Sequence, residues 1–272
     1  MIKRPVVENG LVADLFHDGS GQPRQAIVML GGSEGGKIWS SIGTRKPVNQ
    51  LVSLGYTLLS LAYFKSPELP ATVEAIPLEY FERAFEWLAG QKEVLSNELI
   101  IIGVSKGGEA ALLLGSLNPK IKAVVALSPS HVVWQGVPKM GGEISNARKS
   151  TWTYKGDALP FVPYQFTSWN LGTSIRTVLF GELLKEHEKA LQNEASVTAA
   201  IIPVEKIQGP ILLMSGKRDQ MWPSTAMCEQ IIRRLEACGF GYPYQHVAYD
   251  ASHTGYILKK ECWRVITTFL QG

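Results

Sequence analysis

The stretch that decides the fold is NELIIIGVSKGGEAALLLGS, from Asn97 to Ser116. Its first half holds the unbroken apolar run Leu99 to Ile102, which is typical of a strand buried on both faces of a parallel sheet. Its second half has apolar residues at helical spacing. Between the halves, Ser105 stands alone between Gly103 and Gly107. The stretch therefore predicts a strand, a tight turn and a helix, with Ser105 on the turn.

The rest of the chain repeats this alternation of short apolar runs and helical patterns. Further strands are predicted at residues 26–30, 56–64, 123–128, 210–215 and 244–249, and further helices at 79–90, 224–238 and 259–270. Such alternation predicts an α/β protein with a doubly wound, mostly parallel sheet. Asn9 and Gly10 lie between two apolar stretches, which favours an antiparallel hairpin at the N-terminal side.

Length and composition limit the classes of function. We expect the 272 residues, of which 45% are hydrophobic, to form a single domain. The net charge of +3 without a basic run argues against nucleic-acid binding, and no apolar run approaches the ~20 residues that span a bilayer. Cys228, Cys238 and Cys262 have neither disulfide-framework nor zinc-site spacing. We expect a cytoplasmic protein that acts on a small molecule without a metal or cofactor.

One segment, from about His131 to Lys206, breaks the alternation. It shows no clear strand pattern and is rich in aromatic residues, among them Trp152 and Trp169. Two interpretations are open: a small satellite core, or a lid over the carboxyl edge of the sheet. If the segment is a lid, His131, Trp152 and Trp169 are candidates to line a substrate pocket.

Ser105 has the sequence context of a nucleophile. G-x-S-x-G alone is a weak pattern, but here a strand precedes it and a helix follows it, as in a nucleophile elbow. The flanking glycines, Gly103 and Gly107, fit a turn too tight for side chains. A plain strand-to-helix turn is the alternative, although it needs no serine.

A nucleophilic serine requires a base and an orienting acid, which follow it in the chain in this type of fold. His253 lies in the loop after the last predicted strand, where a base can reach the sheet edge. Asp219 follows the preceding strand in the same way, whereas Asp250 is so close to His253 that a bracing role in the loop is more plausible. We therefore predict a triad of Ser105, Asp219 and His253. Structural roles are expected for three other histidines: His17 in a polar turn, His187 in the charged helical stretch of the lid segment, and His246 within a predicted strand.

Catalysis by such a triad also needs backbone donors for an oxyanion. One expected donor is the N–H of Lys106, directly after the serine. The second is expected from the loop Gly31 to Gly36, with Ser33 favoured over Glu34; Gly32 and Glu34 are further candidates to contact substrate. A phosphate-binding interpretation of these glycines lacks the required motif spacing.

Several segments together resemble a known family. GVSKGGEAALLLGS, TWTYKGDALPFVP, GKRDQMW and YDASHTGY are similar to the C-terminal catalytic domain of the acyl-CoA thioesterase and bile acid-CoA:amino acid N-acyltransferase family. The resemblance runs from about residue 27 to 256. It implies an α/β-hydrolase fold, an acyl thioester or ester substrate, and the roles of nucleophile, acid and base for Ser105, Asp219 and His253.

Two differences from the family affect what the resemblance implies. Family members carry a β-sandwich domain before the hydrolase domain, whereas about two dozen residues precede the first parallel strand here. The acyltransferase branch typically has cysteine where this chain has Ser105, which favours transfer to water. Similarity to dienelactone hydrolases and prolyl oligopeptidases keeps esters and peptides open as substrates. Acyl transfer to an amine and a non-catalytic ligand-binding module are the remaining alternatives.

Overall fold

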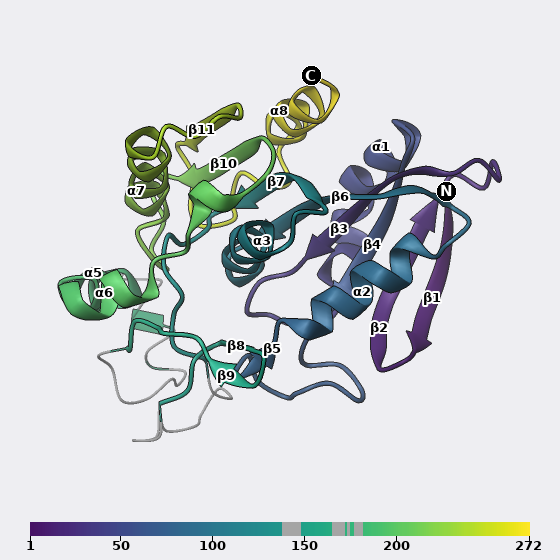
Figure 1. The fold of residues 1–272 in the computed structure, drawn as a ribbon. Helices are drawn as coiled ribbons and strands as arrows, with labels where there is room; N and C mark the ends of the chain where they lie inside the picture. Colours follow the sequence, from purple (N-terminus) through teal and green to yellow (C-terminus); the bar gives the residue numbers. More distant parts are fainter. Residues whose placement is uncertain (138–147, 165–171, 173–174, 177–181) are drawn as a thin grey trace.

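The central feature of the fold is a mixed, mostly parallel sheet (Figure 1). The computed structural model describes residues 1–137, 148–164, 172, 175–176 and 182–272. Within them the sheet has eight strands in the order β1-β2-β4-β3-β6-β7-β10-β11. Their bounds are β1 Ile2–Glu8, β2 Leu11–His17, β3 Arg24–Leu30, β4 Tyr56–Ala62, β6 Val94–Val104, β7 Ile121–Leu127, β10 Ile211–Gly216 and β11 Tyr244–Tyr249. The strands from β4 to β11 in this order are parallel, as the sequence predicts.

The N-terminal strands form the predicted antiparallel hairpin. β1 pairs with β2 in antiparallel register, and β2 pairs with β4 in the same sense. Asn9 and Gly10 connect the two strands with φ of 54° and 72°. Positive φ at both central residues is the conformation of a type I′ turn, which matches the twist of the strands.

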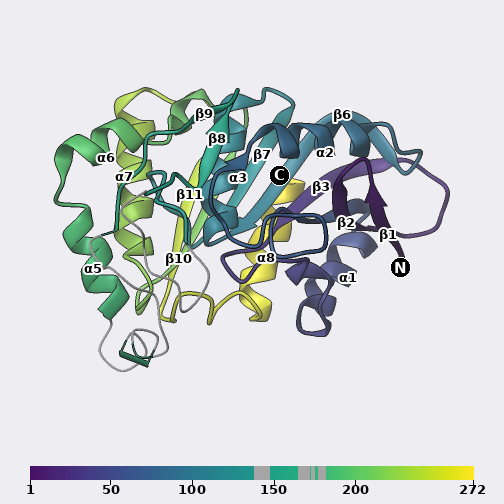
Figure 2. The ribbon, with the colours of Figure 1, turned by 90° about the horizontal axis from the view of Figure 1, so that it is seen from below.

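Helices cover both faces of the sheet. One face packs against α2 (Glu79–Ala89), α3 (Lys106–Leu117) and α7 (Ser224–Ala237). The other packs against α1 (Arg45–Ser53), which the sequence pattern did not predict, and α8 (Lys260–Gln271) (Figure 2). This two-sided cover accounts for the apolar character of the central strands on both faces. No helix in the described part of the chain has both the length and the apolar character to cross a bilayer.

The segment after β7 differs from its prediction, because it contains strands. β8 (Trp152–Tyr154) pairs in parallel with β5 (Ile76–Pro77) and antiparallel with β9 (Asp157–Ala158), which forms a small second sheet. The strands are too short to show a periodic pattern, which is why the sequence did not reveal them. The segment continues with α5 (Glu182–Ala190) and α6 (Glu194–Ala200).

An apolar cluster separate from the two main ones joins this segment to Trp222 and Met227, which lie outside it. Trp134, Tyr164 and Trp222 surround His187, whose ring lies 4.7 Å from that of Trp134 between centroids. Burial lowers the pKa of His187 to about 4, so the ring is neutral at physiological pH. The structural role expected for His187 agrees with this environment.

Candidate active site

Ser105 occupies a sharp turn between β6 and α3. Its φ is 56° and its ψ is −119°, a conformation that non-glycine residues adopt rarely. A Cβ on Gly103 would collide with the backbone of Gly107, and a Cβ on Gly107 would collide with the backbone of Gly31. Glycine is therefore required on both sides of the serine. The strand, turn and helix are those that the sequence predicts.

His253 and Asp219 meet Ser105 at the carboxyl edge of the sheet. The Oγ atom of Ser105 lies 2.9 Å from Nε2 of His253, and Nδ1 of His253 lies 2.6 Å from Oδ2 of Asp219. The other carboxylate oxygen of Asp219 accepts the N–H groups of Met221 at 2.8 Å and Trp222 at 3.3 Å. Only 2% of the Asp219 side chain and 14% of the His253 side chain are exposed. These contacts form one hydrogen-bonded chain from a buried carboxylate to a serine hydroxyl.

The competing carboxylate, Asp250, points elsewhere. Its Oδ1 atom pairs with Nε of Arg218 at 2.8 Å, and its side chain is 78% exposed. Asp250 therefore braces the loop before His253, in keeping with the sequence-based preference for Asp219.

Ser128, directly after β7, forms hydrogen bonds with the loop that carries His253. The Ser128 hydroxyl donates to the backbone oxygen of His253 at 2.6 Å and lies 2.9 Å from the hydroxyl of Tyr256. Tyr256 donates in turn to the Met214 carbonyl at 2.9 Å. The indole of Trp222 packs edge-on against the His253 ring, with 5.7 Å between centroids. Both ring orientation and backbone position are thus fixed by buried groups.

A buried ion pair lies directly beneath the serine. Nζ of Lys106 is 3.0 Å from Oε2 of Glu109, and the two side chains are 2% and 0% exposed. Lys106 also donates to the Thr151 hydroxyl at 2.9 Å, and Glu109 accepts from Trp152 Nε1 at 2.9 Å and Trp134 N at 3.2 Å. Burial lowers the pKa of Lys106 and raises that of Glu109, and each charge offsets this effect on the other. This network ties the small second sheet to the N-terminal turn of α3.

The serine and histidine open into a cleft of about 670 Å³. Most of its wall comes from two segments that the sequence analysis did not select. The residues lining it are Ser33, Glu34, Ile38, Trp39, Ser41, Gly43, Thr44, Val104, Ser105, Met221, His253, Thr254, Ile257 and Leu258. Most of the exposed surface of this wall is apolar. This composition suits an acyl chain or another apolar substituent.

Ser33 and Glu34 lie on this wall, next to the serine, where the sequence analysis expects a second oxyanion donor. The loop that carries them is held at both ends: the Tyr63 hydroxyl donates to the Gly31 carbonyl at 2.7 Å, and Gly36 N–H donates to the Phe64 carbonyl at 3.1 Å. Burial, together with the charges of Glu34 and Glu109, raises the pKa of Tyr63 well above its usual value, which keeps the phenol protonated.

Two of the predicted pocket residues of the lid segment, His131 and Trp152, do not line this cleft. Trp152 is fully buried in the main core, where its ring packs against Tyr63 and Phe81 at 5.8 and 6.0 Å between centroids. Trp152 fails as a pocket residue because its side chain fills the space between the second sheet and α2. His131 lines a separate hollow of about 290 Å³ beside Arg234 and Cys238. Trp169 lies outside the described residues.

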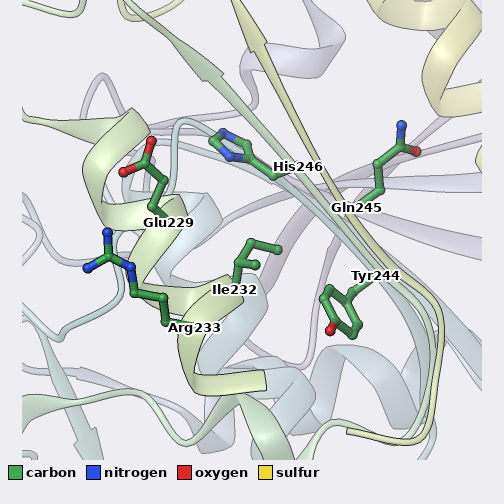
Figure 3. Close-up of a pocket in the computed structure, with 6 residues that line it drawn as sticks. All are labelled: Glu229, Ile232, Arg233, Tyr244, Gln245 and His246. Carbon is green, nitrogen blue, oxygen red and sulfur yellow. The ribbon is translucent and has the colours of Figure 1, made fainter. Parts of the chain in front are cut away.

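Another hollow, of about 360 Å³, lies between α7 and β11 (Figure 3). Glu229, Ile232 and Arg233 of α7 line it opposite Tyr244, Gln245 and His246 of β11. Nε2 of His246 is 2.8 Å from the Ser215 hydroxyl, which places this histidine in a structural contact. None of the three residues of the hydrogen-bonded chain lines this hollow.

The cleft residues that sequence reasoning missed follow two predicted functional loops. Ile38 and Trp39 come directly after the glycine-rich loop, and Ile257 and Leu258 come shortly after His253. The sequence signal that could have identified this wall is the presence of apolar side chains just after two loops that lie at the same sheet edge. The substrate pocket was instead predicted at the aromatic residues of the lid segment, because these form a more conspicuous pattern in the sequence.

Comparison with known proteins identifies the family and the fold of this chain. The family model described as "BAAT / Acyl-CoA thioester hydrolase C terminal" matches residues 76–263, which is more than half of the chain. The chain belongs to this family. The match contains Ser105, Asp219 and His253, and it confirms the resemblance inferred from the sequence motifs.

Curated relatives of this family member include acyl-coenzyme A thioesterase 1 of Rattus norvegicus. It is 30% identical over 250 residues, which cover 92% of this chain and 53% of the relative. The mitochondrial acyl-coenzyme A thioesterase 2 of Mus musculus is 29% identical over 248 residues, covering 91% and 48%. The chain thus spans about half the length of the curated relatives that it matches.

Solved structures establish the fold. The esterase Pf2001 of Pyrococcus furiosus superposes with a TM-score of 0.61 at 17% identity, over 99% of this chain and 91% of that one. The α/β hydrolase GrgF from Penicillium sp. sh18 gives 0.60 at 14% identity, over 99% and 96%. The family member has the α/β-hydrolase fold, as the sequence predicts.

Proposed function

We propose that this protein is a serine hydrolase that cleaves an acyl thioester of the acyl-CoA type, or a carboxylic ester, through an acyl-enzyme intermediate. The observation that carries the proposal is the hydrogen-bonded chain Asp219–His253–Ser105 at the base of a largely apolar cleft. Names of the curated relatives and of the matching family support a thioester as the first substrate to test.

In the proposed reaction, Ser105 Oγ attacks the acyl carbon while His253 Nε2 accepts the hydroxyl proton. His253 then returns this proton to the leaving thiol or alcohol. A water molecule, deprotonated by the same nitrogen, attacks the acyl-enzyme and releases the carboxylic acid and Ser105. Asp219 holds the Nδ1–H tautomer of the ring and stabilises the imidazolium.

The negative charge that develops on the acyl oxygen requires backbone donors. We assign these roles to the N–H of Lys106, at the start of α3, and to the N–H of Ser33, on the cleft wall. Three features position the donors: the glycine contacts around Ser105, the buried Lys106–Glu109 pair, and the hydrogen bonds that fix the loop Gly31 to Gly36. The mechanism requires no metal or cofactor.

The proposal is tested by thiol release from a series of acyl-CoAs, alongside p-nitrophenyl esters. Ser105→Ala is expected to lower kcat by at least about 10⁴-fold, because the nucleophile is removed. Its melting temperature is expected to stay within about 2 °C of wild type. A fluorophosphonate probe should label Ser105 in the wild type, and Ser20→Ala, which changes an exposed serine of the β2–β3 connection, should be labelled equally. Full activity of Ser105→Ala, or labelling at another serine, would refute the assignment.

A further inference from the structure

The carboxylate of Glu34 is turned back over the loop that carries it. Its Oε1 atom accepts the N–H of Gly32 at 2.8 Å, and Oε2 lies 2.7 Å from the position that a Cβ on Gly32 would occupy. The backbone of the loop is fixed at its two ends by the contacts of Gly31 and Gly36 described above. Glu34 is exposed toward the cleft, and its charge lies over Gly32.

This position brings the carboxylate next to the reactive serine. The position that a Cβ on Gly32 would occupy is also 3.0 Å from the Cβ atom of Ser105. Only the space of a missing methyl group therefore separates the carboxylate of Glu34 from the side chain of Ser105. The side chain to which an acyl group would be attached therefore lies next to this negative charge.

No cation in the described part of the chain neutralises Glu34. Lys37 pairs with Asp14 at 2.8 Å, and Lys106 pairs with Glu109. Lys65, whose Cβ lies next to Gly35, forms no salt bridge with Glu34. His253 is directed to Asp219 and Ser105. Glu34 lines the cleft but is exposed, so water and salt screen part of its interaction with a group bound there.

We infer that Glu34 selects substrates by charge: it disfavours acyl groups that carry a carboxylate near the scissile carbonyl and favours acyl groups that carry a cationic, quaternary or primary ammonium group there. This inference rests on the proposed function, since it concerns the substrate of the same site. A cationic group of the substrate can form an ion pair with Glu34, which has no salt-bridge partner in the described part of the chain. A carboxylate in that place meets like-charge repulsion, which is an efficient way to reject a substrate.

The test uses three thioesters of one neutral thiol, N-acetylcysteamine, so that only the acyl charge varies. The acyl groups are 4-(trimethylammonio)butanoyl, its neutral isostere 5,5-dimethylhexanoyl, and glutaryl. Wild type is expected to show kcat/KM about tenfold higher for the cationic group than for the neutral isostere, and at least about tenfold lower for glutaryl. Glu34→Gln keeps an oxygen for the Gly32 N–H but removes the charge, so both ratios should fall to within about twofold of unity.

Glu236→Gln is the matched control, because it removes an exposed carboxylate from α7, outside the cleft. It should retain the wild-type ratios. Unchanged ratios in Glu34→Gln, with the neutral thioester still hydrolysed, would overturn the inference and leave the proposed function intact.

A second readout separates the inference from the proposed function. Two alkyl fluorophosphonates, one with a trimethylammonium group and one with a tert-butyl group, are used to label Ser105. The two labelling rates depend on the charge of Glu34 but do not require turnover. If neither these thioesters nor the acyl-CoAs and p-nitrophenyl esters were hydrolysed, the proposed function would be refuted. A faster reaction of the cationic probe in wild type, lost in Glu34→Gln, would still support charge selection, and equal rates in both proteins would reject it.

Discussion

Two ion pairs flank the site, and they differ in almost every physical respect. Lys106 and Glu109 lie beneath the serine with at most 2% of either side chain exposed, and Glu109 accepts further hydrogen bonds from Trp134 and Trp152. Arg218 and Asp250 lie beside the histidine loop with side chains 68% and 78% exposed. The second pair has a distance of 2.8 Å, which is shorter than the 3.0 Å of the first. Distance alone therefore does not indicate which pair the site depends on.

Burial and the number of converging partners distinguish the two pairs. Each buried charge has lost its water and depends on the groups around it, so that removing one partner leaves the other uncompensated. The exposed charges can return to water at little cost. The same criterion separates the two carboxylates near His253, because Asp219 is buried with three donors and Asp250 is exposed with one arginine.

The largest effect is expected where burial and chemistry coincide, at Asp219. Asp219→Asn should lower kcat on the order of 10⁴-fold, because an amide favours the wrong tautomer of His253. Steady-state kinetics on an acyl thioester measures this loss. Asp250→Asn is the matched control and should change kcat by less than about threefold. A reversal of the two effects would show that exposure is a poor guide to the acid of this site.

An intermediate effect is expected on stability when the buried pair is broken. Glu109→Gln should lower the free energy of unfolding by about 3–5 kcal/mol, because the Lys106 ammonium is left buried without its counter-charge. Urea denaturation followed by tryptophan fluorescence gives this value.

The double variant Lys106→Met/Glu109→Gln is the control for that experiment. It removes both charges, retains the amide oxygen that accepts from Trp134 and Trp152, and retains the backbone N–H of residue 106. It should recover at least half of the lost stability. Equal destabilisation in the single and double variants would mean that the charge itself matters less than the packing of the two side chains.

The smallest effect is expected at the exposed pair. A double-mutant cycle with Arg218→Gln and Asp250→Asn should give a coupling free energy of at most about 1 kcal/mol, which decreases as salt is added. Urea denaturation at low and high ionic strength measures it. A coupling energy comparable to that of the buried pair would remove the contrast between the two regions.

The parts of the fold that were predictable have strong local patterns. Uninterrupted apolar runs such as Leu99 to Ile102 identify parallel strands, and Asn9–Gly10 identifies a hairpin, because few backbone conformations suit these residues. The strand-end positions of Ser105, Asp219 and His253 could be predicted for a topological reason. Parallel strands bring their carboxyl ends to one edge, so residues far apart in sequence converge there.

The parts that were not predictable depend on long-range packing. Trp152 is part of the core because Tyr63, Phe81 and Glu109, all distant in sequence, form a site for its ring and its N–H. Aromatic content alone cannot distinguish such a core residue from a pocket residue. The cleft wall at Ile38 and Leu258 was missed for the complementary reason, since a groove between two loops leaves no periodic pattern in either.

The hydroxyl of Ser128 has a consequence for how activity arises during folding. It joins β7 to the His253 carbonyl across 125 positions of sequence, and the contact of His253 with Ser105 spans 148. Contacts of such long range form late, because large loops must close before these contacts can stabilise anything. Helices and neighbouring strands can therefore be present in a chain in which His253 does not yet contact Ser105. Appearance of activity is then a stricter criterion of the native state than recovery of secondary structure.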